Sequence, residues 1–259
     1  MILYVVITHQ PPDEVRSHLE DFEQVLPGRR AAICYGGTRK DFDALDVAAE
    51  TLFIDDPTLR RTLAQSYTQL LGAVYERLVA PDPACSCVHL IEWDHVILSP
   101  QYETELLDIV AGEGVGLVAR HCADHTFVNW CHSIELLDDR ELEQLLTAIS
   151  VRDQDVPSLW GGLGNGIAIG RSALEELCLR AGHMSRYCEV YLPTVIYHLG
   201  YRVLDAPASA TLFDHLRVGP DYGIEEAVRL AGEGALALHP VKDPAVRGAL
   251  LSAVPAKPS

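Results

Sequence analysis

Residues 88–96 have the sequence VHLIEWDHV, in which an apolar run of strand length stops abruptly at acidic and polar residues. Glu92 and Asp94 follow the run two residues apart. Side chains alternate along an extended chain, so the two carboxylates point the same way. Because ligands of open α/β sheets bind at the carboxyl ends of strands, we expect this stretch to carry both acids into a ligand-binding zone.

Further apolar runs on both sides of this stretch alternate with segments of helical periodicity. The expected strands are residues 4–7, 31–35, 52–54, 88–91, 116–119, 167–169 and 201–204, and the expected helices are residues 15–26, about 57–79, 100 onward, 172–182 and 189–199. Such alternation is typical of a mostly parallel sheet with helices on both faces. The sequence therefore predicts an α/β protein with three layers, α/β/α.

Several of these helix ends can be predicted from capping chemistry. Ser99-Pro100 has the pattern of an N-cap followed by proline at the first helical position. Ser172 and Glu175 have the spacing of a capping box. Gly200 is expected to end the helix over 189–199, although Pro193 lies inside it.

The size and the cysteine pattern limit the class of protein. A chain of 259 residues suits one hydrophobic core, and only residues 254–259 have the character of a frayed tail. The seven cysteines are odd in number and scattered, which favours reduced thiols in a reducing compartment. Residues 1–8 are apolar but lack a basic region and are too short for a secretion signal. We therefore expect a single cytoplasmic domain.

The charge balance excludes several partners. The formal net charge is −17, which repels nucleic-acid backbones and anionic lipid. No apolar run approaches the roughly 18 to 20 residues that a transmembrane helix needs. An anionic substrate would need a local cation, arginines or a helix N-terminus to overcome the overall field.

The paired carboxylates suggest a specific chemistry. Hard carboxylate oxygens bind Mg²⁺ or Mn²⁺, and such a cation can clamp a diphosphate and stabilise it as a leaving group. The simpler alternative is a solvated acidic turn after a core strand. Glu92 and Asp94 alone do not decide between these two interpretations.

A family resemblance favours the first interpretation. Glu92-Trp93-Asp94, after an apolar strand and before a proline-led helix, resembles the D-x-D signature of GT-A glycosyltransferases. Residues 160–167, 188–203 and 238–242 resemble, in the same order, the acceptor-side strand, the acidic catalytic helix and the C-terminal metal-binding segment of those enzymes. Glu92 stands where the family usually has aspartate, and Glu189 stands alone where the family usually has a pair of acids.

The resemblance implies a Rossmann-like GT-A fold and a metal-dependent transfer of sugar from a nucleotide-diphosphate donor, such as a UDP- or GDP-sugar, to a glycan or small-molecule hydroxyl. Residues of about 1–115 would bind the donor, and residues of about 116–253 the acceptor. Asp94 and His239 would bind Mn²⁺ or Mg²⁺, and Glu92 would contact the ribose or a metal-bound water. Glu189 would be the general base if the stereochemistry inverts.

Further donor contacts follow from the same resemblance. Thr8 and His9 would border the base or ribose, and Trp93 would belong to the same donor site. Lys242 and either Arg60 or Arg61 would neutralise the diphosphate. Each of these residues also has an ordinary alternative as a strand end or a solvated surface side chain. Trp160 is a candidate for stacking on a sugar ring, or equally a half-buried core residue.

Two alternatives remain open. His121 and His125 lie four residues apart with Cys131 nearby, which allows a zinc-dependent hydrolase; residues 120–132 also suit an acceptor-pocket wall or an irregular loop. A non-catalytic domain that binds a nucleotide sugar or glycan is the other alternative. The glycines of residues 161–166 precede a strand and do not have the G-x-G-x-x-G spacing, which argues against a dinucleotide-binding oxidoreductase.

Overall fold

The computed structural model describes residues 1–55, 67–126, 132–133, 136, 139–153, 158–182, 184, 186–206 and 210–253. Arg60, Arg61, Cys131 and the C-terminal tail (254–259) lie outside the described residues.

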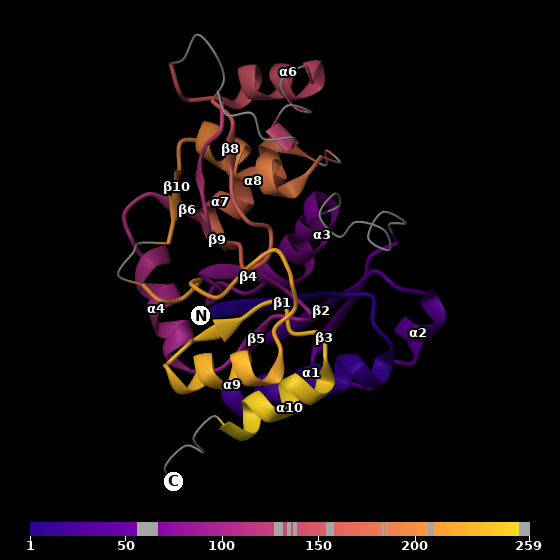
Figure 1. Ribbon diagram of the computed structural model, residues 1–259. Helices are drawn as coiled ribbons and strands as arrows, with labels where there is room; N and C mark the ends of the chain where they lie inside the picture. Colours follow the sequence, from indigo (N-terminus) through magenta and orange to yellow (C-terminus); the bar gives the residue numbers. More distant parts are fainter. Residues whose placement is uncertain are drawn as a thin grey trace.

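A seven-stranded sheet forms the centre of the molecule (Figure 1). Its strands stand in the order β10 (Arg202–Asp205), β6 (Val115–Ala119), β9 (Ala168–Gly170), β4 (Cys87–Glu92), β1 (Ile2–Thr8), β2 (Ala31–Tyr35) and β3 (Glu50–Phe53). All neighbouring pairs are parallel except those of β9, which runs antiparallel to both β4 and β6. The carboxyl ends of β1, β4 and β6 therefore lie at the same edge of the sheet, which we call the carboxyl edge.

Helices cover both faces of this sheet (Figure 1). The helices among the described residues are α1 (Pro12–Val25), α2 (Arg39–Asp43), α3 (Tyr67–Val74), α4 (Gln101–Val110), α6 (Arg140–Ile149), α7 (Arg171–Glu176), α8 (Cys188–His198), α9 (Ile224–Gly232) and α10 (Pro244–Ala253). Single π-helical turns, Tyr75–Val79 and Leu177–Ala181, continue α3 and α7. The prediction of a three-layer α/β fold with a mostly parallel sheet is confirmed.

Alternate side chains of strand β1 pack into the hydrophobic cores on the two faces of the sheet. Leu3, Val5 and Ile7 join the core formed with α3, α6, α7 and α8. The alternate residues Tyr4 and Val6, with Ile2, join the core formed with α1 and α4. All residues of β1 are buried, because a central parallel strand has helices on both sides. A third, smaller core lies between α9 and α10.

Two small antiparallel pairs extend the carboxyl edge. β5 (Val96–Ile97) pairs with β11 (Ala237–Leu238), and β7 (Ala123–Asp124) pairs with β8 (Trp160–Gly161). The first pair fixes the C-terminal segment beside the acidic end of β4, where Val241 N also donates to the Asp94 carbonyl at 2.9 Å. Residues far apart in the sequence thereby reach one site.

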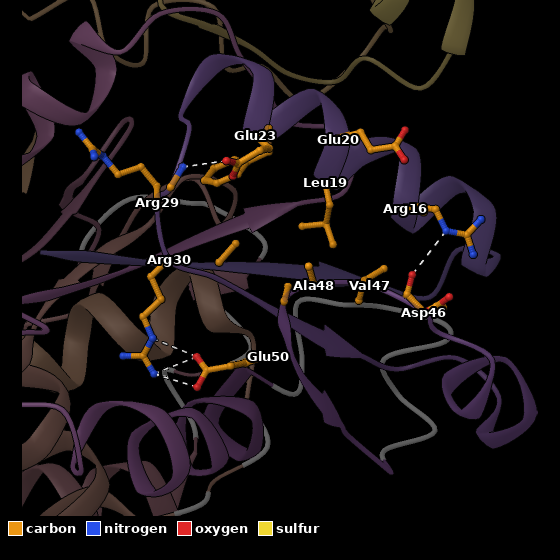
Figure 2. Close-up of a pocket in the computed structure, with 14 residues that line it drawn as sticks. Arg16, Leu19, Glu20, Glu23, Arg29, Arg30, Asp46, Val47, Ala48 and Glu50 are labelled. Carbon is orange, nitrogen blue, oxygen red and sulfur yellow. Dashed lines mark hydrogen bonds and ion pairs between the residues drawn. The ribbon is translucent and has the colours of Figure 1, made fainter.

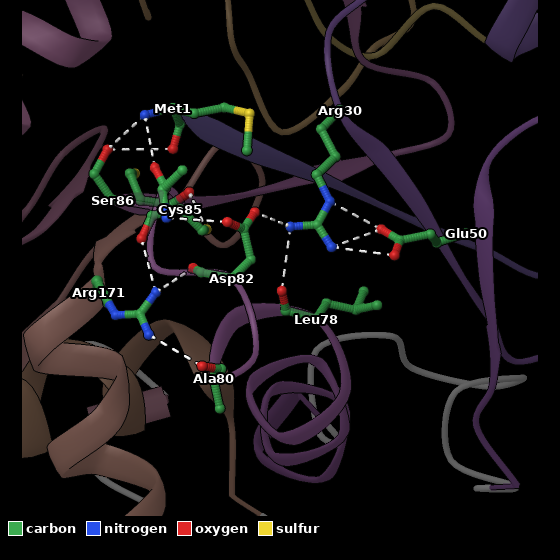
Figure 3. Close-up of polar contacts among 11 residues, drawn as sticks. Met1, Arg30, Glu50, Leu78, Ala80, Asp82, Cys85, Ser86 and Arg171 are labelled. Atoms are coloured by element: carbon green, nitrogen blue, oxygen red, sulfur yellow. Dashed lines mark hydrogen bonds and ion pairs between the residues drawn. The ribbon is translucent and has the colours of Figure 1, made fainter.

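The amino ends of the strands are closed by polar contacts around residues 80–86 (Figure 3). Arg171 Nη1 donates to the carbonyls of Asp82 and Cys85, at 2.6 and 3.1 Å. Arg30 pairs with Asp82 at 2.7 Å and with Glu50 at 2.8 Å. The Met1 ammonium donates to the Ala84 carbonyl and to Ser86 Oγ, each at 3.1 Å.

The expected strands all lie within two residues of the observed ones, but some helix ends differ. The capping box at Ser172 and Glu175 was wrong: α7 begins one residue earlier, with Gly170 as N-cap and no side-chain cap. Ser99 Oγ does accept from Gln101 N at 3.2 Å, although the first helical residue is Gln101 and not Pro100. Gly200, with φ of 101°, ends α8 as expected. No helix among the described residues has the length and hydropathy of a membrane span.

Candidate functional site

Two carboxylates and one imidazole converge at the carboxyl end of β4. Glu92 is the last residue of β4, and Asp94 lies two residues on, in the turn before β5. His239 Nε2 is 3.3 Å from Glu92 Oε2 and 3.3 Å from Asp94 Oδ1. The potential ligand atoms of Glu92, Asp94 and His239 lie within 4.8 Å of one another. We call these three residues the metal triad.

His239 reaches this place through backbone pairing and has a fixed ring orientation. It directly follows β11 and forms a parallel bridge with Leu216. Its Nδ1 lies 3.1 Å from the Arg217 carbonyl, which can only accept, so Nδ1 carries a proton and donates. Nε2 then faces the carboxylates. A carbonyl partner on the second nitrogen is the usual arrangement of a metal-binding histidine.

The electrostatics of the metal triad favour a cation. Burial alone would lower the pKa of His239, but the facing carboxylates of Asp94 and Glu92 raise it to about 9. Asp94 is only 3% exposed, and among the described residues the group beside its Oδ1 is His239 Nε2, at 3.3 Å. A buried carboxylate is costly unless positive charge faces it, and either a protonated His239 or a bound cation supplies that charge. The residues present therefore fit a divalent ion with two oxygen ligands and one nitrogen ligand.

The floor of the site is the glycine-rich segment 161–166, which we call the glycine segment. Asn165 Oδ1 accepts from Glu92 N at 3.0 Å, and Gly166 N donates to the Leu90 carbonyl at 3.0 Å. Gly166 has φ of +84°, and a Cβ there would lie 2.8 Å from Leu216. Glycine is needed here because the backbone passes too close to its neighbours for a side chain.

Glu189 on α8 holds the glycine segment at two points. Pro193 has no N–H for the carbonyl four residues before it, so the Glu189 carbonyl is free and accepts from Gly162 N at 2.9 Å. The Glu189 side chain accepts from Gly164 N at 2.7 Å through Oε1 and from Tyr187 Oη at 2.7 Å through Oε2. Proline inside the helix thus creates the backbone acceptor that positions Glu189 against the floor.

Tyr67 links the two acidic groups of the site. Its hydroxyl donates to Glu92 Oε1 at 3.3 Å. Burial raises the pKa of Tyr67 well above its usual range, and the nearby charges of Glu92 and Glu189 add to the rise. Glu92 and Glu189 therefore lie around one phenol. Tyr67 lies in the helix expected over about 57–79, and nothing in the local pattern singles out Tyr67, Asn165 or Tyr187, because their roles depend on long-range contacts.

Comparisons with known proteins identify structures of similar fold. No known protein family and no curated protein matches the sequence. Among solved structures, a mannosyltransferase from Pyrobaculum calidifontis in complex with GDP-Man and Mn²⁺ has 14% identity and a TM-score of 0.50, covering 97% of this chain and 68% of that chain. The fold is GT-A-like. At this identity the likeness shows the fold alone.

Two further structures are similar at lower scores. A CMP:2-keto-3-deoxy-manno-octonic acid synthetase complexed with CTP has 11% identity, a TM-score of 0.42, and coverage of 79% of this chain and 89% of that chain. A 4-diphosphocytidyl-2C-methyl-D-erythritol synthase has 10% identity, a TM-score of 0.43, and coverage of 80% and 90%.

Three of the other predicted donor residues lie near the carboxyl end of β1 in the GT-A-like fold. Thr8 ends β1, and its buried Oγ1 accepts from Gln10 N at 3.1 Å. Trp93 Nε1 lies 3.3 Å from the Gln10 side chain, oriented so that the amide oxygen accepts, which brings Trp93 beside the end of β1. His9 is exposed in the same turn. Thr8, His9 and Trp93 therefore lie near one another.

The contacts of Lys242 and Trp160 do not favour their predicted binding roles. Lys242 Nζ lies 3.4 Å from Asp221 Oδ1, and both side chains are about half exposed, so the lysine already has an acidic partner. Trp160 stacks on Tyr197 with ring centroids 5.0 Å apart, which favours the core interpretation of this residue. Arg61, the remaining predicted phosphate ligand, lies outside the described residues.

The proposed zinc cluster does not assemble among the described residues. His121 is exposed and His125 is partly buried. In the part of the chain that the structure describes, the group of potential metal ligands is the metal triad, which contains neither histidine. Cys131 lies outside the described residues.

An open cavity of about 920 Å³ lies elsewhere, between α1 and residues 46–50 at the amino ends of β2 and β3 (Figure 2). No member of the metal triad lines it. Its arginines have partners: Arg30 pairs with Glu50, and Arg16 Nε donates to the Asp46 carbonyl at 3.5 Å. The cavity therefore carries none of the chemistry of the carboxyl edge.

Proposed function

We propose that the chain is a metal-dependent glycosyltransferase that uses a nucleotide-diphosphate sugar. The observation that carries this proposal is the metal triad at the carboxyl end of β4, in a fold similar to that of the GDP-Man- and Mn²⁺-bound mannosyltransferase. An acidic turn that was merely solvated would not bury Asp94 or place an imidazole between two carboxylates.

In this proposal Asp94 and His239 hold Mn²⁺ or Mg²⁺, and Glu92 completes the ligand set or contacts the ribose. The bound ion supplies positive charge that holds the diphosphate and stabilises the departing nucleoside diphosphate. Thr8, His9 and Trp93 border the base and ribose, since they lie together at the end of β1. Arg61 and Lys242 complete the proposed donor site.

Glu189 is the proposed general base. It lies across the glycine segment from the metal triad, and both of its oxygens are oriented by hydrogen bonds. A carboxylate has about four lone-pair sites, so Glu189 can still accept a proton from an acceptor hydroxyl while it keeps these two bonds. This role requires inversion at the anomeric carbon.

The proposal divides the chain at about residue 115 into a donor half and an acceptor half. GDP-mannose and other GDP- or UDP-sugars are the first donors to test, because the similar mannosyltransferase binds GDP-Man. The acceptor is a glycan or a small hydroxyl compound. The scattered cysteines place the protein in the cytoplasm in this proposal.

The test is thermal unfolding with GDP, UDP, GDP-mannose and UDP-glucose, each with and without Mn²⁺. A ligand at 100 times its Kd stabilises the fold by about 2.7 kcal/mol, which is several degrees in Tm. We expect this shift to need Mn²⁺ and to vanish in Asp94→Asn, while Asp108→Asn, an exposed acid on α4, keeps it. Absence of a shift with all four ligands would overturn the proposal.

A further inference from the structure

Arg120 is a half-buried arginine without a partner. Among the described residues, the arginines whose side chains make no hydrogen bond and no ion pair are Arg77, Arg120 and Arg140. Arg77 and Arg140 are exposed on helical segments, where water solvates a guanidinium. Arg120 is only partly accessible. Withdrawing a cation from water without a counter-charge costs free energy, so its position calls for an anionic ligand.

Sheet order places Arg120 on the acceptor side of the metal triad. It directly follows β6, which is parallel to β4 and separated from it only by β9. Two strand spacings correspond to roughly 10 Å, so Arg120 lies at the same edge as the triad. Thr8 and β1 lie on the opposite side of β4. Arg120 is therefore on the far side of the triad from the proposed nucleoside contacts.

Contacts of the glycine segment connect Arg120 to Glu189. The Arg120 carbonyl accepts from Leu163 N at 2.8 Å, and the next residue, Gly164, donates to Glu189 Oε1. Gly162, on the other side of Leu163, donates to the Glu189 carbonyl. Arg120 and the proposed base thus form hydrogen bonds with three consecutive residues of the glycine segment, 162–164.

The Arg120 charge acts on Tyr222, a residue tied to the segment that holds His239. Burial raises the pKa of Tyr222, and the charges of Arg217 and Arg120 oppose that rise, so Arg120 lies within electrostatic reach of this phenol. Tyr222 Oη donates to the His215 carbonyl at 3.0 Å, and the same carbonyl accepts from His239 N at 3.2 Å. Arg217, in contrast, is already paired with Glu226.

The backbone after Arg120 is strained. His121 has φ of 57° and is the non-glycine residue with positive φ in the described part of the chain. That conformation costs roughly 1–2 kcal/mol for a residue with a Cβ. Cys122 then returns to the core, against Gly162. Strain of this kind gathers at ligand-binding turns and persists only where the surrounding contacts hold it.

We propose that Arg120 binds a carboxylate or phosphate group of the acceptor, and that the transferase therefore glycosylates an anionic hydroxyl compound. This inference rests on the proposed function. With a net charge of −17 the protein repels anions as a whole, so an acidic acceptor needs a local cation. A guanidinium suits both groups because it can donate two parallel hydrogen bonds to their oxygens.

The test uses acceptors that differ only in charge. Glycerol, glycerate and glycerol 3-phosphate form one set, and glucose, glucuronate and glucose 6-phosphate form a second. Binding is measured by calorimetry on protein loaded with Mn²⁺ and the nucleoside diphosphate, and transfer is measured with the matching donor. The variants are Arg120→Gln, Arg120→Lys and, as the matched control, Arg77→Gln.

We expect the wild-type protein to bind an anionic member of a set more tightly than its neutral member. Arg120→Gln should weaken binding of that anionic compound by about 10- to 100-fold, because hydrogen bonds to a charged group contribute that much to affinity. Binding of the neutral member and of the nucleoside diphosphate changes less than twofold, and Arg77→Gln changes nothing. Arg120→Lys keeps the charge but loses the paired geometry, so it lies between wild type and Arg120→Gln. The anionic compound whose binding falls most in Arg120→Gln shows whether Arg120 binds a carboxylate or a phosphate.

Two results would overturn the inference and leave the proposed function intact. One is equal binding of neutral and anionic members by the wild-type protein. The other is a loss of nucleoside diphosphate binding in Arg120→Gln as large as the loss of acceptor binding, which would assign Arg120 to the donor. If Arg120→Gln does not fold, Arg120→Lys alone decides. Failure of the wild-type protein to load with Mn²⁺ and nucleotide is separate, since it overturns the proposed function itself.

Discussion

The two edges of the central sheet use similar polar residues in opposite ways. At the amino edge, Arg30, Arg171 and the Met1 ammonium all donate to neighbouring carbonyls or carboxylates (Figure 3). At the carboxyl edge, the group beside Asp94 Oδ1 among the described residues is the His239 imidazole, and the Arg120 side chain makes no hydrogen bond or ion pair with them. The difference lies in pairing and not in residue type.

This comparison separates stability from function. A charge that is fully paired within the chain has no capacity left for a ligand, and its removal weakens the fold. A charge held without a partner costs stability and is available to a ligand. Variants at the amino edge should therefore change unfolding, and variants at the carboxyl edge should change binding or turnover. Three substitutions test this separation, from the largest expected effect to the smallest.

Glu189→Gln should have the largest effect. Loss of a general base lowers kcat by about 100- to 10,000-fold. The amide oxygen still accepts from Gly164 N, so the Tm and the affinity for Mn²⁺ and nucleoside diphosphate should stay near those of the wild type. Glu143→Gln, an exposed acid on α6, is the matched control. Turnover within threefold of the wild type would remove Glu189 from the catalytic role.

Arg171→Met should lower the free energy of unfolding by about 2–3 kcal/mol, because carbonyls of residues 80–85 lose a charged donor. Urea unfolding measures this change, with Arg77→Met as the exposed control. Nucleotide affinity should not change, since Arg171 lies at the amino edge. An unchanged unfolding midpoint together with weakened nucleotide binding would contradict the division between the two edges.

Glu50→Gln should have the smallest effect. The Glu50 side chain is 46% exposed in its pair with Arg30, and Arg30 keeps Asp82 as a second partner. Partly exposed ion pairs contribute about 1 kcal/mol or less, and salt screens them. The difference in unfolding free energy from the wild type should shrink in 1 M NaCl. A loss larger than that of Arg171→Met would show that the side-chain pair, and not the contacts to carbonyls, closes the amino edge.

The sequence predicted the sheet well because hydrophobic alternation is a local signal. The seven expected strands coincide with the central sheet, and the acidic end of β4 lies at the predicted edge. His239 was predicted only through a family resemblance, yet the structure places it between Glu92 and Asp94. The catalytic, metal and donor roles of these residues remain proposals.

Other parts of the site could not be predicted from local pattern. Asn165 and Tyr67 act through contacts with Glu92 that cross the fold, and neither residue stands out in its own segment. The antiparallel direction of β9 and the helices α6, α9 and α10 were also not predicted. The capping box at Ser172 failed because spacing alone does not make a cap, and Arg171 there contacts the loop before β4.

Pro193 was at first only a reason to doubt a helix, yet it ties α8 to the floor of the site. Because the nitrogen of Pro193 carries no hydrogen, the Glu189 carbonyl has no partner within the helix and accepts from the glycine segment. The Glu189 carboxylate accepts from the same segment. Helix and glycine segment are consequently joined through both the main chain and the side chain of one residue. If Glu189 is the base that we propose, the main chain sets its distance from a hydroxyl bound on that segment before any substrate arrives.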